Sequence, residues 1–297
     1  MRTALADVLA RRPVALDGGL ATRLEQCGHD LSSDLWSARL LVEDPDEIEA
    51  AHRDYFAAGA EVAITASYQV SYEGLATLGL DHERTDELLG LSVALARRAA
   101  DGFPGDRWVA ASVGPYGATL GDGEEYVGDY ELTLDELRAW HRPRLAALVA
   151  AEPDVLAIET IPCRIEVEAL LAEMRGSEVP CWISLTADGP LTRQGEPLAE
   201  VFAMARDVPE VIAVGVNCCT ADTVDAVVRL AAEASGKPVV VYPNSGEDWD
   251  GAARRWVGAP TFQPDRVTSW VQAGARLVGG CCRVDPPEIE RIAALLR

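Results

Sequence analysis

Ile212–Cys219 reads IAVGVNCC, and its pattern is the starting point for predicting the fold. Its first five residues form an apolar run of strand length, and the polar pair Asn217 and Cys218 follows at once. The next segment, Thr220–Ala234, carries apolar side chains at helical period. A short buried strand that leads into polar residues and then into a helix is one βα unit of a parallel sheet.

The same unit recurs along the whole chain. Apolar runs of strand length lie at Val14–Leu16, Val62–Thr65, Val109–Ser112, Val155–Glu159, Trp182–Leu185, Ile212–Val216, Val239–Tyr242 and Arg276–Val278. Segments with helical period lie between them, among them Pro45–Ala58, Thr85–Ala100, Leu134–Ala151, Arg164–Met174, Thr220–Ala234 and Pro286–Leu296. Eight units in 297 residues predict an α/β protein with a single (β/α)8 TIM barrel that spans residues 1–297. A doubly wound open sheet is the alternative, but the fingerprint G-x-G-x-x-G is missing after the first strand.

Polar residues follow the predicted strands at the point where each strand ends. They are Asp17–Gly19, Thr65, Gly114–Tyr116, Glu159, Asn217–Cys219, Asn244 and Gly279–Cys282. In a barrel the carboxyl ends of all strands form one catalytic face, so we expect these residues to converge there. The segment Gly117–Tyr130, rich in Gly, Asp and Glu, is predicted to be a long surface loop on the same face.

Composition excludes several classes of function. The net charge of −22 disfavours binding to nucleic acid or to anionic membranes, and 48% apolar residues argue against global disorder. No targeting segment and no apolar run of transmembrane length is visible, so we expect a cytoplasmic protein. Seven cysteines, an odd number, argue against a disulfide framework.

Three of these cysteines lie on the predicted catalytic face. Cys281 and Cys282 are adjacent, and Cys218 follows a strand that only one other strand separates from theirs. Three thiolates leave a fourth tetrahedral position open, which is how a catalytic zinc site is built. The spacing alone leaves a redox disulfide between Cys281 and Cys282 open, and we expect Cys27, Cys163 and Cys181 to be buried structural cysteines.

The chain resembles the homocysteine S-methyltransferases from near its start to near its end. The matching motifs are DGGLATRLEQCG (17–28), ITASYQ (64–69), SVGPYG (112–117), GDYELTLDELRAWHRPR (128–144), IETIP (158–162), GVNC (215–218), YPNSGE (242–247) and GGCCRVDPPEI (279–289). The resemblance implies a (β/α)8 barrel with zinc bound by Cys218, Cys281 and Cys282, with Cys219 as a bystander. It also implies a homocysteine pocket lined by Asp17, Gly18, Thr65, Glu159 and Asn217.

The resemblance is strongest to the short branch of the family, which uses a sulfonium methyl donor. It implies transfer of a methyl group from S-methylmethionine or S-adenosylmethionine to the thiol of homocysteine, which gives methionine; sequence does not decide between the donors. Zinc lowers the pKa of a bound thiol, and a sulfonium leaves as a neutral thioether, so we expect no side chain to act as an obligatory general base. Asp17 or Glu159 could pair with the substrate ammonium group.

Further expectations concern the donor and the surroundings of the site. Tyr68, Tyr116, Tyr126 and Trp249 are candidates to face a sulfonium cation. The acidic loop Gly121–Glu131 is expected to be solvated, and the four histidines are expected to be structural or exposed. We expect a monomer or a small homo-oligomer that acts on small molecules.

Two other classes of function stay open. One is a metal-free barrel lyase or hydrolase that uses Asp17 and Glu159 as an acid/base pair. The other is a redox sensor built on a Cys281–Cys282 disulfide. Neither of them explains a third cysteine on the same face.

Overall fold

A closed ring of eight parallel strands forms the centre of the protein in this computed structural model, which describes residues 2–29, 36–120, 123–250 and 255–297. The hydrogen-bonded order of the strands is β1-β12-β9-β8-β5-β4-β3-β2, and a parallel bridge between Leu16 and Val62 joins the last strand to the first. The strands are β1 (Val14–Ala15), β2 (Val62–Ile64), β3 (Trp108–Val113), β4 (Val155–Ile161), β5 (Cys181–Leu185), β8 (Val211–Asn217), β9 (Val239–Tyr242) and β12 (Ala275–Val278). The predicted (β/α)8 barrel is therefore confirmed.

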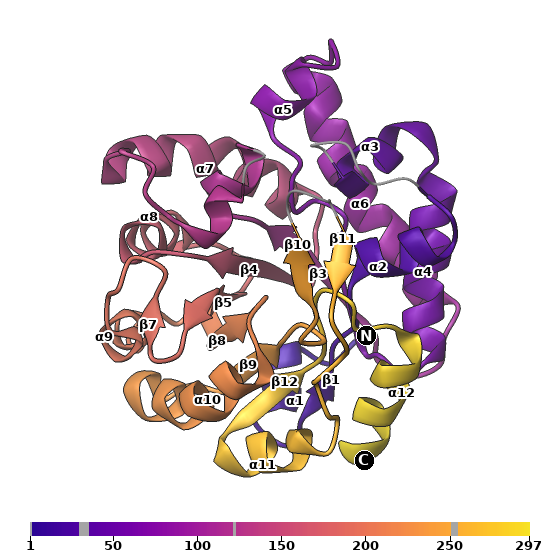
Figure 1. Ribbon diagram of the computed structural model, residues 1–297. Helices are drawn as coiled ribbons and strands as arrows, with labels where there is room; N and C mark the ends of the chain where they lie inside the picture. The colour runs from indigo at the N-terminus through magenta and orange to yellow at the C-terminus, as the bar shows by residue number, and fades with distance from the viewer. Residues whose placement is uncertain (1, 30–35, 121–122, 251–254) are drawn as a thin grey trace.

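Helices surround this ring on its outside (Figure 1). They are α2 (Leu20–Gln26), α3 (Trp36–Glu43), α4 (Pro45–Ala57), α5 (Tyr72–Ala76), α6 (His82–Asp101), α7 (Leu134–Ala150), α8 (Arg164–Met174), α9 (Leu198–Ala203), α10 (Ala221–Ser235), α11 (Arg266–Ala273) and α12 (Pro286–Leu295). Local sequence explains where several begin: α4 begins with Pro45, and α7 begins with a capping box between Thr133 and Glu136.

Alternation along each strand separates two apolar clusters. In β4, Val155 and Ala157 belong to the cluster inside the barrel, whereas Leu156 and Ile158 belong to the cluster between the strands and the helices. A short helix that the sequence analysis did not predict, α1 (Leu5–Leu9), packs against the inner cluster. It contacts residues at the starts of the strands, so it closes the end of the barrel opposite the predicted catalytic face.

The same alternation makes the last inward positions of several strands polar. The inward positions alternate along each strand. The next inward residue after Ala110 is Ser112 and the next after Ala157 is Glu159, and Asn217 is the second inward residue after Ala213. All three polar residues are buried. The inner cluster is thus apolar from its closed end upward and becomes polar only at the carboxyl ends of the strands.

Some elements differ from the prediction. The segment 117–130 contains two short 3-10 turns, η1 (Tyr116–Thr119) and η2 (Glu124–Tyr126), rather than irregular loop alone. Two small hairpins are also present, β6 (Ala187–Asp188) with β7 (Leu191–Thr192) and β10 (Asp248–Asp250) with β11 (Arg255–Val257). These elements are too short to give a periodic signal in the sequence.

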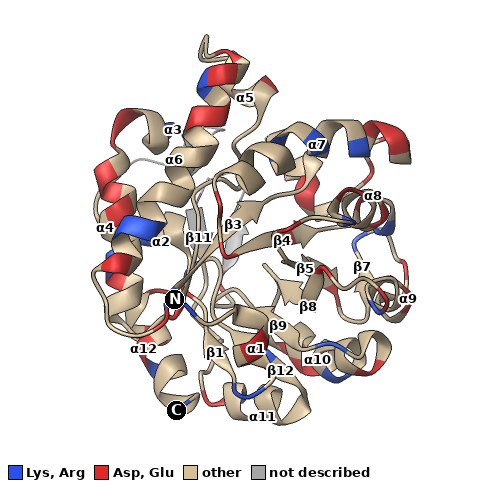
Figure 2. Cartoon of the chain, turned by 180° about the vertical axis from the view of Figure 1, so that it is seen from behind, with Lys and Arg blue, Asp and Glu red and all other residues tan. Residues whose placement is uncertain are grey.

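Most charged residues lie on the outside of the molecule, and Asp17, Arg144, Glu159 and Glu166 are buried exceptions. Figure 2 shows acidic residues on outer helices such as α4 and α8, whereas the strands carry few charged residues. Within the described residues, no helix is long and apolar enough to cross a membrane.

Gly215 in β8 tests the barrel's close packing. A Cβ atom there would lie 1.7 Å from the backbone oxygen of Val240 on β9. We expect Gly215→Ala to lower the free energy of unfolding by at least about 3 kcal/mol, because the clash is with backbone that cannot move without breaking the β8–β9 pairing.

Gly90 in α6 supplies the control, since a Cβ there meets nothing within 4 Å. Gly90→Ala should raise the free energy of unfolding by about 0.5–1 kcal/mol, because alanine favours the helix. Urea unfolding of both variants measures the difference; equal stability of Gly215→Ala and the wild type would contradict the described pairing.

Candidate metal centre and its cavity

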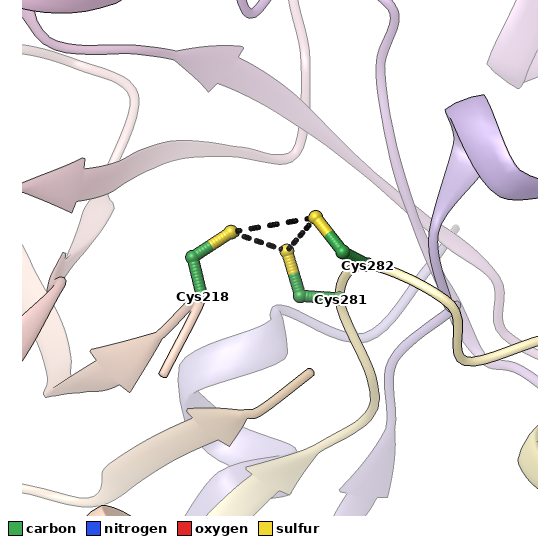
Figure 3. Close-up of side chains that lie close together, drawn as sticks. All are labelled: Cys218, Cys281 and Cys282. Atoms are coloured by element: carbon green, nitrogen blue, oxygen red, sulfur yellow. Dashed lines mark hydrogen bonds between the residues drawn. The ribbon is translucent and has the colours of Figure 1, made fainter. Parts of the chain in front are cut away.

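Three cysteine thiols meet at the carboxyl ends of β8 and β12. The Sγ atom of Cys218 lies 2.7 Å from that of Cys281 and 4.0 Å from that of Cys282, and the last two are 4.0 Å apart (Figure 3). This is the one group of three His, Cys, Asp or Glu side chains with ligand atoms this close in the described part of the chain.

The three sulfur atoms fit a tetrahedral metal ion in number and in chemistry. Zinc–sulfur bonds of about 2.3 Å separate the sulfurs of a tetrahedron by roughly 3.8 Å, which two of the three separations match. The remaining pair, Cys218 and Cys281, has to move apart by about 1 Å. Soft sulfur ligands favour zinc over magnesium or calcium.

The chain after β9 holds the two cysteine loops together. The backbone oxygen of Tyr242, the last residue of β9, accepts a hydrogen bond from the amide of Cys218 (3.3 Å). The backbone oxygen of Pro243 accepts one from the amide of Cys281 (2.8 Å). Asn244 bridges both loops. Its side-chain oxygen accepts a hydrogen bond from the backbone amide of Cys282 (3.1 Å), and its backbone amide donates one to the carbonyl of Cys219 (2.9 Å). Asn244 is therefore a positioning residue that the sequence analysis placed on this face without a role.

The three thiols influence one another's protonation. Hydrogen bonds from Cys218 and Cys281 lower the pKa of Cys282 well below its usual value. The pKa of Cys281 is raised by its hydrogen bonds with Cys218 and Cys282 and by burial. The contacts among the three thiols thus favour the thiolate form of Cys282.

A cavity of about 140 Å³ opens beside the thiols. Its walls come from the ends of β1, β2, β4, β8, β9 and β12 and from η2, and the described residues that line it include no Lys, Arg or His. Tyr242 forms part of this wall, with its hydroxyl held by Trp182 Nε1 at 3.1 Å. The volume suits a small molecule of amino-acid size better than the larger ligands that occupy drug-sized pockets.

Four of the five residues predicted for the substrate pocket line this cavity: Gly18, Thr65, Glu159 and Asn217. Asp17 does not line it; it is buried beside Gly18, and its Oδ2 accepts a hydrogen bond from the amide of Ile64 (2.8 Å). Its second oxygen, Oδ1, is buried without a partner among the described residues. Burial raises the pKa of Asp17 well above its usual value.

Glu159 is the buried carboxyl group of the cavity wall. It accepts a hydrogen bond from Ser112 Oγ, the last inward side chain of β3. Burial raises the pKa of Glu159 to about 7, although hydrogen bonds from Ser112 and Tyr242 oppose the increase. A cation that entered the cavity would favour the charged form of this carboxyl group.

Asn217 stabilises a strained turn at the end of β4. Its Oδ1 accepts from the amide of Thr160 and from Ser184 Oγ (both 2.8 Å), and its Nδ2 donates to Thr160 Oγ1 (2.7 Å). Thr160 has φ of 61° and Cys218 has φ of 47°, a left-handed conformation that is unusual for both residue types. Strained backbone of this kind concentrates at functional sites.

Thr65 also has structural partners. Its hydroxyl hydrogen-bonds Ser67 Oγ at 2.8 Å and accepts from the amide of Ser112 at 3.0 Å. Its side chain thus joins the ends of β2 and β3 while it lines the cavity.

The aromatic candidates divide into two groups. Tyr68 and Tyr126 line the cavity, whereas Tyr116 does not and instead packs edge-on against Tyr130 and Trp140. Trp249 lies in β10, whose side chains fall outside the described part of the structure.

Glu125 corrects the expectation that the acidic loop is solvated. It lines the cavity beside Tyr126, and burial raises its pKa to about 7. The loop folds back through η2, and the high acidity of the whole chain hid this one inward carboxyl group.

The other cysteines follow the prediction with one exception. Cys163 and Cys181 are buried. Cys219 is also buried, and its sulfur does not belong to the cluster formed by Cys218, Cys281 and Cys282. Cys27 was expected to be buried and is exposed, because it is the residue at which α2 ends and the chain turns away.

Comparison with known proteins places the chain in a family. The family model described as homocysteine S-methyltransferase matches residues 14–296. The chain is 42% identical to the homocysteine S-methyltransferase YbgG of Bacillus subtilis, covering 96% of this chain and 94% of that protein. It is 43% identical to the homocysteine S-methyltransferase of Escherichia coli, with 94% of each covered.

A solved structure agrees with these sequence matches. The crystal structure of the homocysteine methyltransferase MmuM from Escherichia coli, in its metallated form, superposes with a TM-score of 0.89 at 40% identity. The superposition covers 98% of this chain and 99% of that one. The chain therefore belongs to the homocysteine S-methyltransferase family and is a methyltransferase of that class.

Proposed function

We propose that residues 1–297 form one zinc-binding barrel domain that transfers a methyl group from a sulfonium donor, S-methylmethionine or S-adenosylmethionine, to the thiol of homocysteine. The product of this transfer is methionine. Zinc is held by Cys218, Cys281 and Cys282. The observation that carries the proposal is the convergence of these three thiols beside a cavity of amino-acid size.

The site offers negative charge and no positive charge, which supports the proposed ligands. Three thiols and the carboxyl groups of Glu159 and Glu125 face or line the cavity, and no described lining residue is basic. The proposed ligands supply several positive groups: the metal ion, the ammonium groups of homocysteine and of the donor, and the sulfonium group of the donor. Each of them relieves charge that the protein alone holds at a cost.

Bound zinc would accept the homocysteine sulfur at its open fourth position and keep it deprotonated, and hence nucleophilic, at neutral pH. Cys218 and the pair of Cys281 and Cys282 would hold the metal from two loops, and Asn244 fixes the backbone of both loops. The chain thus sets the place of the nucleophile before the donor arrives.

Glu159 binds the ammonium group of homocysteine as a carboxylate. Asp17 does not line the cavity, so it would assist through its buried charge and not by direct contact. Asn217 and Thr65 hold the strand ends that carry these groups. Both carboxyl groups have raised pKa values in the free site, so binding of a cation returns them to the charged form.

The methyl transfer needs no proton from the protein. A bond forms from the homocysteine sulfur to the methyl carbon as the bond from that carbon to the sulfonium sulfur breaks. The electron pair of the broken bond stays on the donor sulfur, which leaves as a neutral thioether. Alignment of the two sulfurs is what the cavity supplies.

Substitution of Cys281 tests the metal centre. We expect wild-type protein prepared under reducing conditions to contain about one zinc per chain and to methylate homocysteine. Cys281→Ser should lose most of the zinc and most of the activity together, because a catalytic site with two thiolates holds the metal weakly. Metal analysis and methionine formation with each donor measure both losses.

Cys27→Ser is the matched control, since Cys27 is exposed and does not belong to the cluster of Cys218, Cys281 and Cys282. It should keep zinc and activity unchanged. Full methylation activity in metal-free protein, or in Cys281→Ser, would contradict the zinc mechanism; a reversible disulfide with no metal would favour the redox sensor.

The pH dependence of homocysteine binding tests Glu159. Since the pKa of Glu159 is about 7 in the free site, its carboxylate form increases between pH 6 and pH 8. The KM for homocysteine should therefore fall as the pH rises through 7. Glu159→Gln should raise that KM about 10- to 100-fold at pH 8 and remove the component of the pH profile centred near 7.

Ionisation of the homocysteine thiol contributes the same pH dependence to both proteins, so the difference between their profiles isolates Glu159. Identical profiles for the wild type and Glu159→Gln would show that this carboxyl group does not bind the ammonium group.

A further inference from the structure

The motif WHRPR at Trp140–Arg144 matches the family but has no part in the metal chemistry. It lies in α7, on the outside of the barrel, and yet His141 and Arg144 are completely buried. Glu166 of the neighbouring helix α8 is completely buried as well. These three side chains form a charged cluster behind the cavity wall.

Arg144 joins the chain after β2 to the chain after β3. Its guanidinium group donates to the backbone oxygens of Gly114 and Tyr68, both at 3.1 Å. It lies over the ring of Trp140, 4.9 Å from the ring centroid, which fixes its orientation. Burial lowers its pKa to about 10, so the group stays charged at neutral pH.

Glu166 anchors the start of the segment that covers the cavity. Its Oε1 accepts from the amide of Tyr116 (2.6 Å) and from His141 Nε2 (2.9 Å), so this nitrogen of His141 carries the proton. Burial lowers the pKa of His141, which keeps the ring neutral. Tyr116 in turn packs against Tyr130, at the far end of the same segment.

The segment between Tyr116 and Tyr130 carries Glu125 and Tyr126 into the cavity wall. Arg193 lies over the ring of Tyr126, 5.6 Å from its centroid, and supports that ring from outside. Tyr68 completes this wall, and its position depends on Gly114. A Cβ atom on Gly114 would lie 2.5 Å from the backbone oxygen of Tyr68 and 2.8 Å from its ring.

The cluster is a poor way to stabilise a fold. His141 Nδ1, Arg144 Nε and Glu166 Oε2 are buried without a hydrogen-bond partner among the residues that the structure describes. Buried charged groups with unpaired polar atoms are often no more stabilising than apolar side chains of the same size. What the cluster does provide is a fixed direction for three backbone groups, those of Tyr68, Gly114 and Tyr116.

Those backbone groups position Tyr68 and the chain that leads to Glu125 and Tyr126, which line the cavity together with the residues proposed above to bind homocysteine. Tyr68 and Tyr126 present aromatic rings and Glu125 a carboxyl group, which together suit a sulfonium cation. Gly18, Glu159 and Asn217 belong to strand ends that Arg144 does not contact, whereas Thr65 is linked through Ser67 to the chain that Arg144 holds.

We propose that Arg144, supported by Glu166 and His141, is a positioning residue for the methyl donor. It holds Tyr68 and the chain that carries Glu125 and Tyr126, which form the donor subsite of the cavity, and its loss leaves homocysteine binding largely unchanged. The inference rests on the proposed function, because it assigns a part of the same site to the donor.

The test compares Arg144→Met, which removes every donor group at similar volume, with Arg144→Lys, which keeps the charge but not the forked geometry. We expect Arg144→Met to raise the KM for S-methylmethionine or S-adenosylmethionine, whichever the wild type uses, by ~10-fold or more, with the KM for homocysteine within ~2-fold and zinc content unchanged. Arg144→Lys should restore part of the loss.

Two further variants complete the design. Gly114→Ala displaces Tyr68 while the side chains of Arg144, Glu166 and His141 are all retained. It should therefore raise the KM for the donor in the same selective way even if Arg144→Met does not fold. Arg142→Met is the matched control, since Arg142 lies two residues away on α7, is exposed and pairs with Glu173; it should change neither KM.

The outcomes separate this inference from the proposed function. Wild-type protein that binds zinc and methylates homocysteine, while Arg144→Met and Gly114→Ala change both KM values equally or neither, overturns the positioning role alone. Wild-type protein without zinc or without methylation overturns the proposed function, and the donor assignment with it.

Discussion

The hydrogen bonds of the chain after β9 are the interaction on which the site depends. Two cysteine loops that are far apart in the sequence approach each other because Tyr242, Pro243 and Asn244 bind the backbone of both. A β9 strand of four residues between β8 and β12 places this connection where it is needed. The cluster of Cys218, Cys281 and Cys282 is thus a consequence of barrel topology and of one short segment that bridges the loops after β8 and β12.

Buried acidic groups determine the electrostatics of the site. Asp17, Glu125 and Glu159 all have raised pKa values, each chiefly because of burial, and hydrogen bonds from the other two thiols lower the pKa of Cys282. A site of this kind is incomplete until cations enter it. The metal ion, an ammonium group and a sulfonium group are three such cations, and one methyl transfer to homocysteine brings them together.

Sequence alone predicted the parts of this structure that depend on periodicity. The eight strands were placed within three residues of their ends, because each is an apolar run bounded by polar residues at the catalytic face. The cysteines of GVNC and GGCC converged as expected, since parallel strands bring their carboxyl ends to one edge.

Sequence reasoning missed what depends on tertiary contacts. Helix α1 is only five residues long and is held by the inner cluster. Tyr242 and Ser112 looked like ordinary strand residues, although counting by two along β9 and β3 would have found them as the last inward positions. Glu125 and Arg144 were hidden for a different reason: charged residues on a loop and on an outer helix are normally solvated, and only packing shows that these two are not.

Zinc-edge X-ray absorption of the reduced, metal-loaded protein counts the sulfur atoms bound to the metal. We predict three sulfur neighbours at about 2.3 Å without substrate and four after homocysteine is added. A sulfur count that does not increase with homocysteine, or a resting site with fewer than three sulfurs, would contradict the proposed zinc mechanism.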